Sequence, residues 1–404
     1  MERDHARPDF PGARRNGCGA CLGWALVAVI AAALGQYLTV RYNYEGHATA
    51  LFFTGSSRPV PPPLVGEVYQ VEDPRGFDGQ LYHYVAHDPL MRWGFDQYVD
   101  NPRLRWRRIL VPGLAAVLSL GNPGWVDWSY FGVVLGFVFL GTYWVARYLA
   151  GLGIYPGFAL GFVVLPGVFG SLERMTVDAA LLALCAGFAV YVSLSPGWKL
   201  YVVLAFSPFA RETGLLVAAG YALYNLLQRQ WLRLAIFSTA VVPWLLWVAY
   251  VHSKTGADLT AWFAGYPFAG LVERTLNPVA FEITGRWVAA AAVADYLGIL
   301  GTWVAIGTVA GLVPKKPRDS LTLDPMTMSC VAFVGLAAIL GKADVWEQSV
   351  DFARVLSPLF LWLAMMGIAR GERWMLAPLG LVVVRVGVQV WVHLPGVVRG
   401  VLSN

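Results

Sequence analysis

Residues 21–40 read CLGWALVAVIAAALGQYLTV, an apolar run that contains no charged side chain. About 20 helical residues are needed to cross the roughly 30 Å of hydrocarbon in a bilayer. The run therefore predicts a membrane-spanning helix near the N-terminus. The basic, proline-containing segment before it, with no clear small-residue cleavage site after it, is typical of an uncleaved signal anchor.

The composition extends this reading to the whole chain. Hydrophobic residues make up 57% of the 404 positions, charged residues only 14%, and the mean hydropathy is +0.55. A soluble domain needs more polar surface than this. The net charge of +5 is spread over loops and forms no basic stripe, so nucleic acid is not an expected partner. The sequence also carries no phosphate-cradling glycine loop, dinucleotide fingerprint or serine nucleophile motif.

Further apolar runs predict an all-α, polytopic transmembrane helix bundle of about eleven spans. These lie at 21–40, 128–145, 154–170, 178–194, 200–209, 213–228, 234–251, 287–313, 326–340, 355–368 and 374–391. The run 109–121 is too short to cross and predicts a juxtamembrane helix. We expect a cytoplasmic tail at 1–20 and a single transmembrane domain at 21–404, with an extracytoplasmic loop at 41–108.

The orientation follows from the short basic loops, because cytoplasmic loops are enriched in Lys and Arg. Basic residues that would share one side are Arg3, Arg7, Arg14 and Arg15 in the tail, and Arg147, Arg229, Arg233, Lys315, Lys316, Arg318, Arg370 and Arg373 in loops. This pattern predicts a multi-pass protein of the inner (plasma) membrane with a cytoplasmic N-terminus.

The orientation requires that 200–228 forms two short helices that turn at Arg211 and Glu212. A single helix would reverse every later span and would leave both charges in mid-membrane, where each costs about 2.5–3.5 kcal/mol on insertion scales. We therefore favour the hairpin.

Candidate catalytic carboxylates lie in the first outer loop. Asp78 is the main candidate, and Glu72 and Asp73 are the reserve candidates. Asp78-Gly79 is also a strong turn dipeptide. Apolar residues then recur at helical spacing, which favours an interfacial helix on the membrane with Asp78 at its N-cap.

The same loop contains two histidines, His83 and His87, four positions apart and hence on one helical face. Together with Asp88 or Glu72 they form a weak candidate for a divalent metal site, and no other cofactor is expected. Interfacial helices rich in Tyr and His also occur without a metal. Cys18 and Cys21 form a C-x-x-C pair, but no second pair completes a zinc site.

Charged residues that break the orientation rule gather on the outer side and invite a functional explanation. Candidate substrate-binding residues are Arg105, Arg107 and Arg108 from the basic cluster at 103–108, together with Glu173, Asp178, Arg211, Glu212 and Arg354. The cluster could bind anionic lipid headgroups or clamp a phosphate. Arg211 and Glu212 could be only an ion pair, and Asp295 and Arg385 could form a structural pair or line a cavity.

Five segments resemble conserved stretches of a known superfamily. Residues 77–89, FDGQLYHYVAHDP, resemble the "(Y/F)DGQxYxxIAxDP" segment of bacterial membrane proteins similar to the GT-C superfamily of integral-membrane glycosyltransferases, and the "WDxxxYxxIA" segment of its GPI-mannosyltransferase branch. Matches follow in order at 105–112 ("RYxRILYP"), 176–179 ("xTDA"), 210–214 ("xRETG") and 352–358 ("xxRVLxP"). The chain departs from the pattern in having Phe77 in place of Trp, and in lacking the large soluble C-terminal domain of some members.

The resemblance implies a bundle of many transmembrane helices and a sugar donor linked to polyprenyl phosphate. The donor sugar, a hexose or a pentose, would be transferred with inversion, and Asp78 would be the general base. The residue types suit this chemistry, because one carboxylate must accept the proton of the acceptor hydroxyl and cations must stabilise the departing phosphate.

Two other classes compete with an enzyme. One is a non-catalytic scaffold or lipid-binding subunit of a larger membrane protein complex. The other is a lipid-sugar transporter, which would place charges along a path through the bilayer. Clustering at the outer face argues against transport.

Overall fold

The computed structural model describes residues 16–194, 197–256, 262–277, 286–313, 324–347 and 349–402. Nearly all regular structure is helical, as the composition predicts. The helices are α1 (Asn16–Asn43), α2 (Asp78–His87), α3 (Pro102–Arg107), α4 (Leu110–Leu118), α5 (Val126–Gly151), α6 (Pro166–Arg174), α7 (Asp178–Ser193), α8 (Trp198–Ala210), α9 (Leu215–Leu227), α10 (Trp231–Ser238), α11 (Val242–Lys254), α12 (Ala269–Leu276), α13 (Arg286–Leu312), α14 (Pro325–Ile339), α15 (Ala343–Trp346), α16 (Ser349–Arg370) and α17 (Ala377–Leu402). Two short strands, β1 (Thr54–Gly55) and β2 (Gln70–Val71), pair in parallel with Thr54 opposite Gln70.

Six helices in the described ranges are long and apolar enough to cross a membrane. They are Cys18–Asn43, Pro123–Gly151, Trp231–Lys254, Val288–Leu312, Val350–Arg370 and Arg373–Leu402. The pair Pro156–Phe162 and Pro166–Arg174, bent by 63°, would make a seventh. Other predicted spans are shorter helices, namely α7, α8, α9 and α14, and the predicted juxtamembrane segment forms α4.

The centre of the bundle is formed by α7 and α16. The apolar window of α16 is 89% buried, whereas those of α1 and of the α10–α11 span are each only 22% buried. A helix that is apolar on every face, such as α7, is expected to lie buried among other helices. The residues of α7 from Asp178 to Val190 are all buried. The indole of Trp362 on α16 donates a hydrogen bond to the Cys185 carbonyl of α7 at 3.0 Å.

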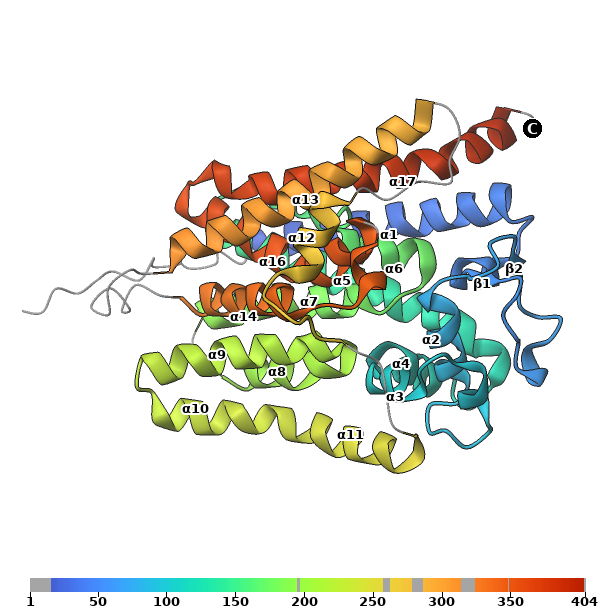
Figure 1. The fold of residues 1–404 in the computed structure, drawn as a ribbon, viewed down its shortest axis with the longest axis horizontal. Helices are drawn as coiled ribbons and strands as arrows, with labels where there is room; N and C mark the ends of the chain where they lie inside the picture. The colour runs from blue at the N-terminus through green and yellow to red at the C-terminus, as the bar shows by residue number, and fades with distance from the viewer. Residues whose placement is uncertain are drawn as a thin grey trace, which may run out of the picture.

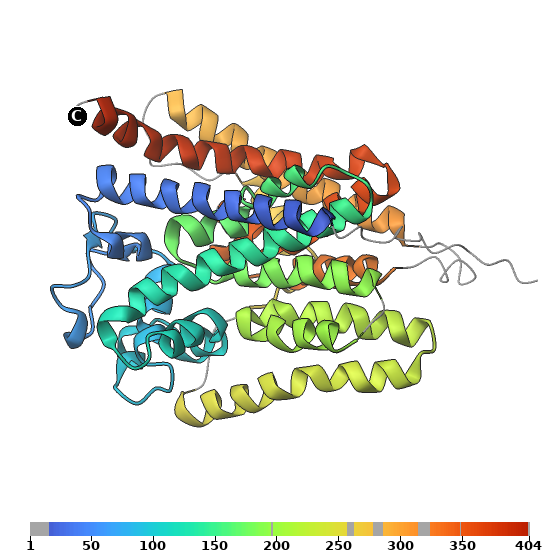
Figure 2. The same ribbon diagram turned by 180° about the vertical axis from the view of Figure 1, so that it is seen from behind.

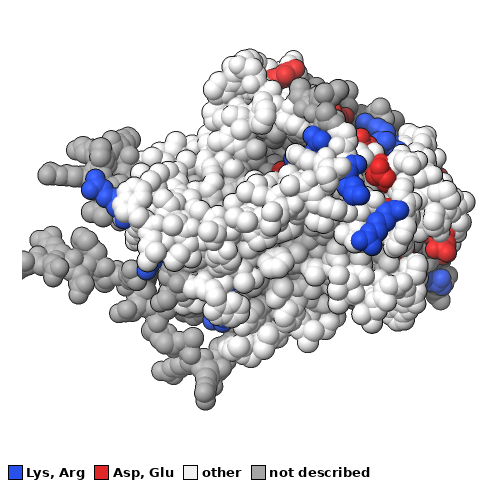
Figure 3. Space-filling model, turned by 90° about the horizontal axis from the view of Figure 1, so that it is seen from below, with Lys and Arg blue, Asp and Glu red and all other residues white. Residues whose placement is uncertain are grey.

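Ends of several helices meet at one end of the bundle. The start of α1, the end of α5, the α9–α10 connection and the α16–α17 connection lie there (Figures 1 and 2). These ends carry Arg147, Arg229, Arg233, Arg370 and Arg373. The basic loop predicted at 315–318 lies outside the described residues. Figure 3 shows Lys and Arg toward one end of the molecule, charges of both signs toward the other, and a broad uncharged surface between them.

The opposite end is covered by the segment between α1 and α4. Trp106 of α3 is fully buried and donates to the Asp88 carbonyl at 2.9 Å, and its own carbonyl accepts from the indole of Trp247 on α11 at 2.7 Å. Residues 79–87 of α2 are all buried. The expected interfacial position of this helix is therefore wrong, because protein rather than lipid surrounds it.

The predicted break between residues 200 and 228 is present. α8 ends at Ala210, Arg211 is extended, and α9 begins at Leu215 and runs back beside α8 (Figure 1). Gly214 permits this turn, because a Cβ atom there would lie 2.1 Å from the Ser207 carbonyl oxygen. The hairpin thus depends on a residue with no side chain.

We expect Gly214→Ala to lower the midpoint of thermal unfolding in detergent, because overpacking costs about 1–3 kcal/mol. Gly132→Ala in α5 is the matched control, since its new Cβ would meet no atom within 4 Å. The control should keep the wild-type midpoint or exceed it. Equal midpoints for Gly214→Ala and the control would contradict the close turn.

Candidate functional site

A cavity of about 610 Å³ opens at the end of the bundle where the segment between α1 and α4 lies. This volume is within the range of about 300–1,000 Å³ that small-molecule sites occupy. Its charged lining consists of Asp73, Arg75, Asp78, Asp100, Arg105, Arg108, Arg174, Arg211, Lys342, Asp344, Glu347, Asp351, Arg354 and Arg385. The cavity thus combines seven arginines and one lysine with six carboxylates.

Asp78 is the first residue of α2 and not its N-cap, which is Phe77. Its side chain makes no cap and instead accepts from two arginines. Oδ1 lies 2.9 Å from Arg105 Nη1, and Oδ2 lies 2.6 Å from Arg354 Nη2. The next residue, Gly79, allows α2 to approach α6, because a Cβ there would lie 2.0 Å from the Arg174 carbonyl oxygen.

The environment of Asp78 determines its charge. Burial by itself would raise the pKa of this carboxyl, but Arg105, Arg354 and Arg108 outweigh burial and hold the pKa well below its usual range. Asp78 is therefore an anion at neutral pH. In this arrangement it is a weak proton acceptor, because a general base works best with a pKa near the working pH.

Asp178 is a second carboxylate that pairs with buried arginines, next to Asp78 and its partners. It begins α7, pairs with Arg211 Nη1 through Oδ1, and lies 3.4 Å from Arg354 Nε through Oδ2. The hydroxyl of Thr176 donates to Oδ2 at 2.9 Å. Arg354 therefore joins the two carboxylates Asp78 and Asp178 in one chain of ion pairs.

Glu212 forms a third centre with Arg108. The guanidinium binds the carboxylate bidentately, with Nε–Oε2 and Nη2–Oε1 distances of 2.7 and 2.5 Å. Burial would raise the pKa of Glu212, but Arg108 and Arg211 lower it to about 2. The Tyr82 hydroxyl accepts from Arg108 Nη1 at 2.6 Å and from Arg105 Nη1 at 3.4 Å, which links this pair to the Asp78 centre.

Several guanidinium N–H groups in this network have no hydrogen-bond acceptor among the described residues. They include Arg354 Nη1 and Arg211 Nε, and both atoms are buried. An unpaired buried donor is costly, so a bound anion would satisfy these groups. Phe77 lies under the guanidinium groups of Arg174 and Arg354, at 4.4 and 4.9 Å from its ring centre, and helps to orient them.

Other predicted site residues lie apart from this network. Glu72 is exposed and does not line the cavity, and Asp73 lines it but accepts the backbone N–H groups of Arg75 and Gly76 in a turn. Arg107 does not line the cavity, and its Nε donates to the Arg103 carbonyl. Glu173 accepts from Gln389 at 2.8 Å.

The candidate residues drawn from the sequence do not include Asp100, Asp351 or Arg174, which all line the cavity. Asp100 binds Arg105 through both carboxylate oxygens, at 3.0 and 2.8 Å. Asp351 lines the cavity and makes no hydrogen bond or ion pair with the residues that the structure describes. Its position three residues before Arg354, on the same face of α16, was a signal that could have identified it. In the sequence, Asp351 and Arg174 were considered only as charges that flank outer turns.

Of the two alternatives considered for Asp295 and Arg385, lining a cavity holds for Arg385. Asp295 pairs with Arg274 of α12, a residue that the sequence did not single out. Arg385 donates to Gln389 at 3.1 Å and lines the cavity.

The two histidines of α2 have a different partner from those predicted. His83 Nε2 lies 2.6 Å and His87 Nε2 lies 3.2 Å from Asp127 Oδ1, at the start of α5. Asp88 instead accepts the backbone N–H groups of Arg92 and Trp93. The prediction of Asp88 or Glu72 as the third group was wrong, because the fold brings a residue from another helix to this face.

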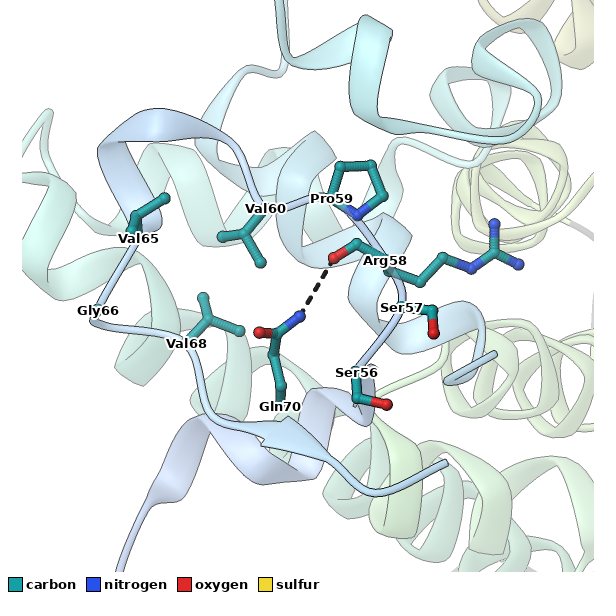
Figure 4. Close-up of a pocket in the computed structure, with 9 residues that line it drawn as sticks. All are labelled: Ser56, Ser57, Arg58, Pro59, Val60, Val65, Gly66, Val68 and Gln70. Carbon is teal, nitrogen blue, oxygen red and sulfur yellow. Dashed lines mark hydrogen bonds between the residues drawn. The ribbon is translucent and has the colours of Figure 1, made fainter. Parts of the chain in front are cut away.

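A second hollow of about 410 Å³ lies on the surface of the segment between α1 and α2 (Figure 4). Gln70 donates to the Arg58 carbonyl there at 3.1 Å. The Arg58 side chain points away from Gln70, and its Nε donates to the Arg75 carbonyl. This hollow has no converging charged groups, so we place the candidate site in the larger cavity.

Comparison of the chain with protein-family models, with curated proteins and with solved structures finds no match.

We expect Asp178→Asn to destabilise the protein strongly, because it leaves two buried arginines short of a counter-charge and breaking a buried pair costs about 3–5 kcal/mol. The control is Asp344→Asn, whose carboxylate pairs with Lys342 but is 74% exposed. An exposed pair contributes about 0–1 kcal/mol. The measurement is the thermal unfolding midpoint in one detergent. Similar midpoints for both variants would contradict a buried network.

The Arg108–Glu212 pair predicts a pH dependence. Glu212 has a pKa of about 2 in the folded protein, against an ordinary value of 4.5, so the unfolded state binds the proton more readily. The stabilisation is therefore complete above about pH 4.5 and is lost as the pH falls toward 2. We expect the stability difference between wild type and Glu212→Gln to shrink over this window. A constant difference from pH 6 to pH 2.5 would contradict the pairing.

Proposed function

We propose that this protein is a GT-C-like membrane glycosyltransferase. It moves a hexose or pentose from a polyprenyl-phosphate donor to an acceptor of the cell envelope, on the outer face of the plasma membrane. One observation carries the proposal. Five segments separated by up to 276 positions deliver Asp78, Arg105 with Arg108, Asp178, Arg211 with Glu212, and Arg354 to one network beside one cavity. These are the five segments that resemble the superfamily.

The arginines support a phosphate ligand. Arg105, Arg108, Arg211 and Arg354 all line the cavity, and two of them present N–H groups that lack a protein acceptor among the described residues. Guanidinium groups bind phosphate oxygens bidentately and do not lose their charge. They would stabilise the negative charge that develops on the departing polyprenyl phosphate.

The proposed step is a direct displacement with inversion. The acceptor hydroxyl oxygen attacks the anomeric carbon, the bond from that carbon to the phosphate oxygen breaks, and the phosphate leaves with the electron pair. The hydroxyl proton passes to a cavity carboxylate. Asp78 can take this role once the donor phosphate binds Arg105 and Arg354, because loss of these partners returns the pKa of Asp78 toward its ordinary value.

Asp351 is the second candidate for the base. It lines the same cavity and needs no arginine to be displaced before it can accept a proton. In that case Asp78 would hold Arg105 and Arg354 in position for the phosphate. The two assignments differ in which carboxylate is indispensable.

The proposal includes an eleven-span topology with a cytoplasmic N-terminus. In this topology, the six long helices, the bent pair and the shorter helices α7, α8, α9 and α14 would each cross once. The grouping of basic loops at the end remote from the cavity supports a cytoplasmic assignment of that end.

A non-catalytic lipid-binding or scaffold subunit is the alternative function. It is favoured by the double ion pair of Asp78, since a carboxylate held by two arginines also suits a purely structural role. Such a protein would bind polyprenyl phosphate in the same cavity and would transfer nothing.

The test compares Asp78→Asn, Asp351→Asn and the control Glu45→Gln, an exposed acid of the same outer segment. Each purified protein is placed in nanodiscs with a panel of polyprenyl-phosphate sugars, and release of free polyprenyl phosphate is measured. Loss of the base should reduce transfer by about 10²–10⁴-fold in protein that remains folded and inserted in the nanodisc. The more strongly affected variant identifies the base.

Full activity in both variants would contradict a carboxylate base in this cavity. Absence of transfer by the wild type, together with saturable binding of polyprenyl phosphate that Arg354→Ala abolishes, would establish the scaffold alternative. Absence of both transfer and binding would overturn the donor assignment.

A further inference from the structure

We propose that His83, His87 and Asp127 bind one Zn²⁺ ion, which fastens the helix that carries Asp78 to the long helix α5. The three ligand atoms lie within 4.8 Å of one another. This inference does not depend on the proposed glycosyltransferase activity.

The two imidazoles converge on a single carboxylate oxygen. His83 Nε2 and His87 Nε2 lie 2.6 and 3.2 Å from the same atom, Asp127 Oδ1. Two histidines four residues apart on one helical face, completed by a carboxylate from another element, form a recurrent arrangement for zinc. A divalent cation among the three groups would balance the negative charge of Asp127. It would also bind the Nε2 atom of each histidine.

Neighbouring aromatic rings fix the directions of both nitrogens. The His83 ring is fully buried and stacks on Phe52, with centroids 4.0 Å apart and an angle of 9° between planes. The His87 ring lies nearly parallel to Phe95, and the two imidazoles are inclined by 79°. Rings held in this way cannot turn to other partners, so the ligand set is already oriented for the ion.

The donor types favour a transition metal such as zinc over calcium or magnesium. Calcium and magnesium require oxygen ligands, whereas two imidazole nitrogens and one carboxylate suit zinc. Asp127 is 24% exposed, which gives the ion a route of entry and leaves the fourth position to water. A three-ligand set with an open position also occurs at catalytic zinc sites, so the location decides the role.

The location indicates a structural ion. At 3.6 residues per turn, His83 and His87 project about 140° and about 180° away from Asp78 around α2. None of the three ligands lines the cavity that holds Asp78. The ion would therefore hold α2 against α5 from the side opposite the cavity, and its binding free energy would add to the stability of the fold.

The experiment uses full-length protein purified without a polyhistidine tag. We expect about one zinc per chain by mass spectrometry, a fall in the unfolding midpoint after chelation, and recovery with one equivalent of Zn²⁺ but not with Mg²⁺ or Ca²⁺. Asp127→Asn and His87→Ala should each weaken zinc binding by at least about 10-fold, since even the loss of a second-shell partner costs about 10–100-fold. His252→Ala, which removes an exposed histidine of α11, should bind zinc as the wild type does.

A wild-type protein that neither retains zinc nor gains stability from it would overturn the proposal, and would leave a cluster of hydrogen-bonded side chains. Zinc binding that survives both ligand variants would overturn the assignment to these residues. If a variant fails to fold, the titration of the chelated wild type decides the question alone.

Discussion

The arrangement of this protein depends on the chain of buried ion pairs that runs from Asp78 through Arg354 and Asp178 to Arg211. Charges removed from water are costly unless each meets a partner with good geometry. Four elements must therefore end at one place: the first turn of α2, the first turn of α7, the turn between α8 and α9, and the start of α16. The same requirement fixes the position of α3, because Arg105 of this helix also reaches Asp78.

The apolar core and the ion pairs support each other. α7 and α16 are enclosed by other helices along most of their length, so their register is set by packing. The first turn of α7 and the second turn of α16 then place Asp178 and Arg354 side by side. In return, the pairs satisfy charged groups that the surrounding apolar residues cannot solvate. In a bundle with the same apolar pattern but without these charges, no ion pairs would fix the positions of the helices along their axes.

The sequence predicted the parts of the structure that local patterns determine. Apolar runs located the long helices, and Arg211-Glu212 marked the break between α8 and α9, because unpaired charges do not sit in the middle of a span. Pairings between distant elements were not predictable. Asp127 stands 40 positions beyond His87, and no local pattern links them. Arg105 and Arg107 are two positions apart in α3, so their side chains point in different directions. Only the packing of that helix decides which of the two faces the cavity. The burial of α2 was missed for the same reason, since its covering residues come from other elements.

The short helices have a consequence for the surrounding lipid. α8 and α9 have 13 residues each, which corresponds to about 20 Å of helix, against a hydrocarbon thickness of about 30 Å. If α8 and α9 cross the bilayer as in the proposed topology, this hydrophobic mismatch is relieved either by local thinning of the bilayer or by a position of the Arg211–Glu212 turn below the headgroup layer. In both cases the charged cavity lies nearer to the midplane than the outer surface elsewhere. A lipid with a charged headgroup could then enter it sideways, with its chains still in the bilayer.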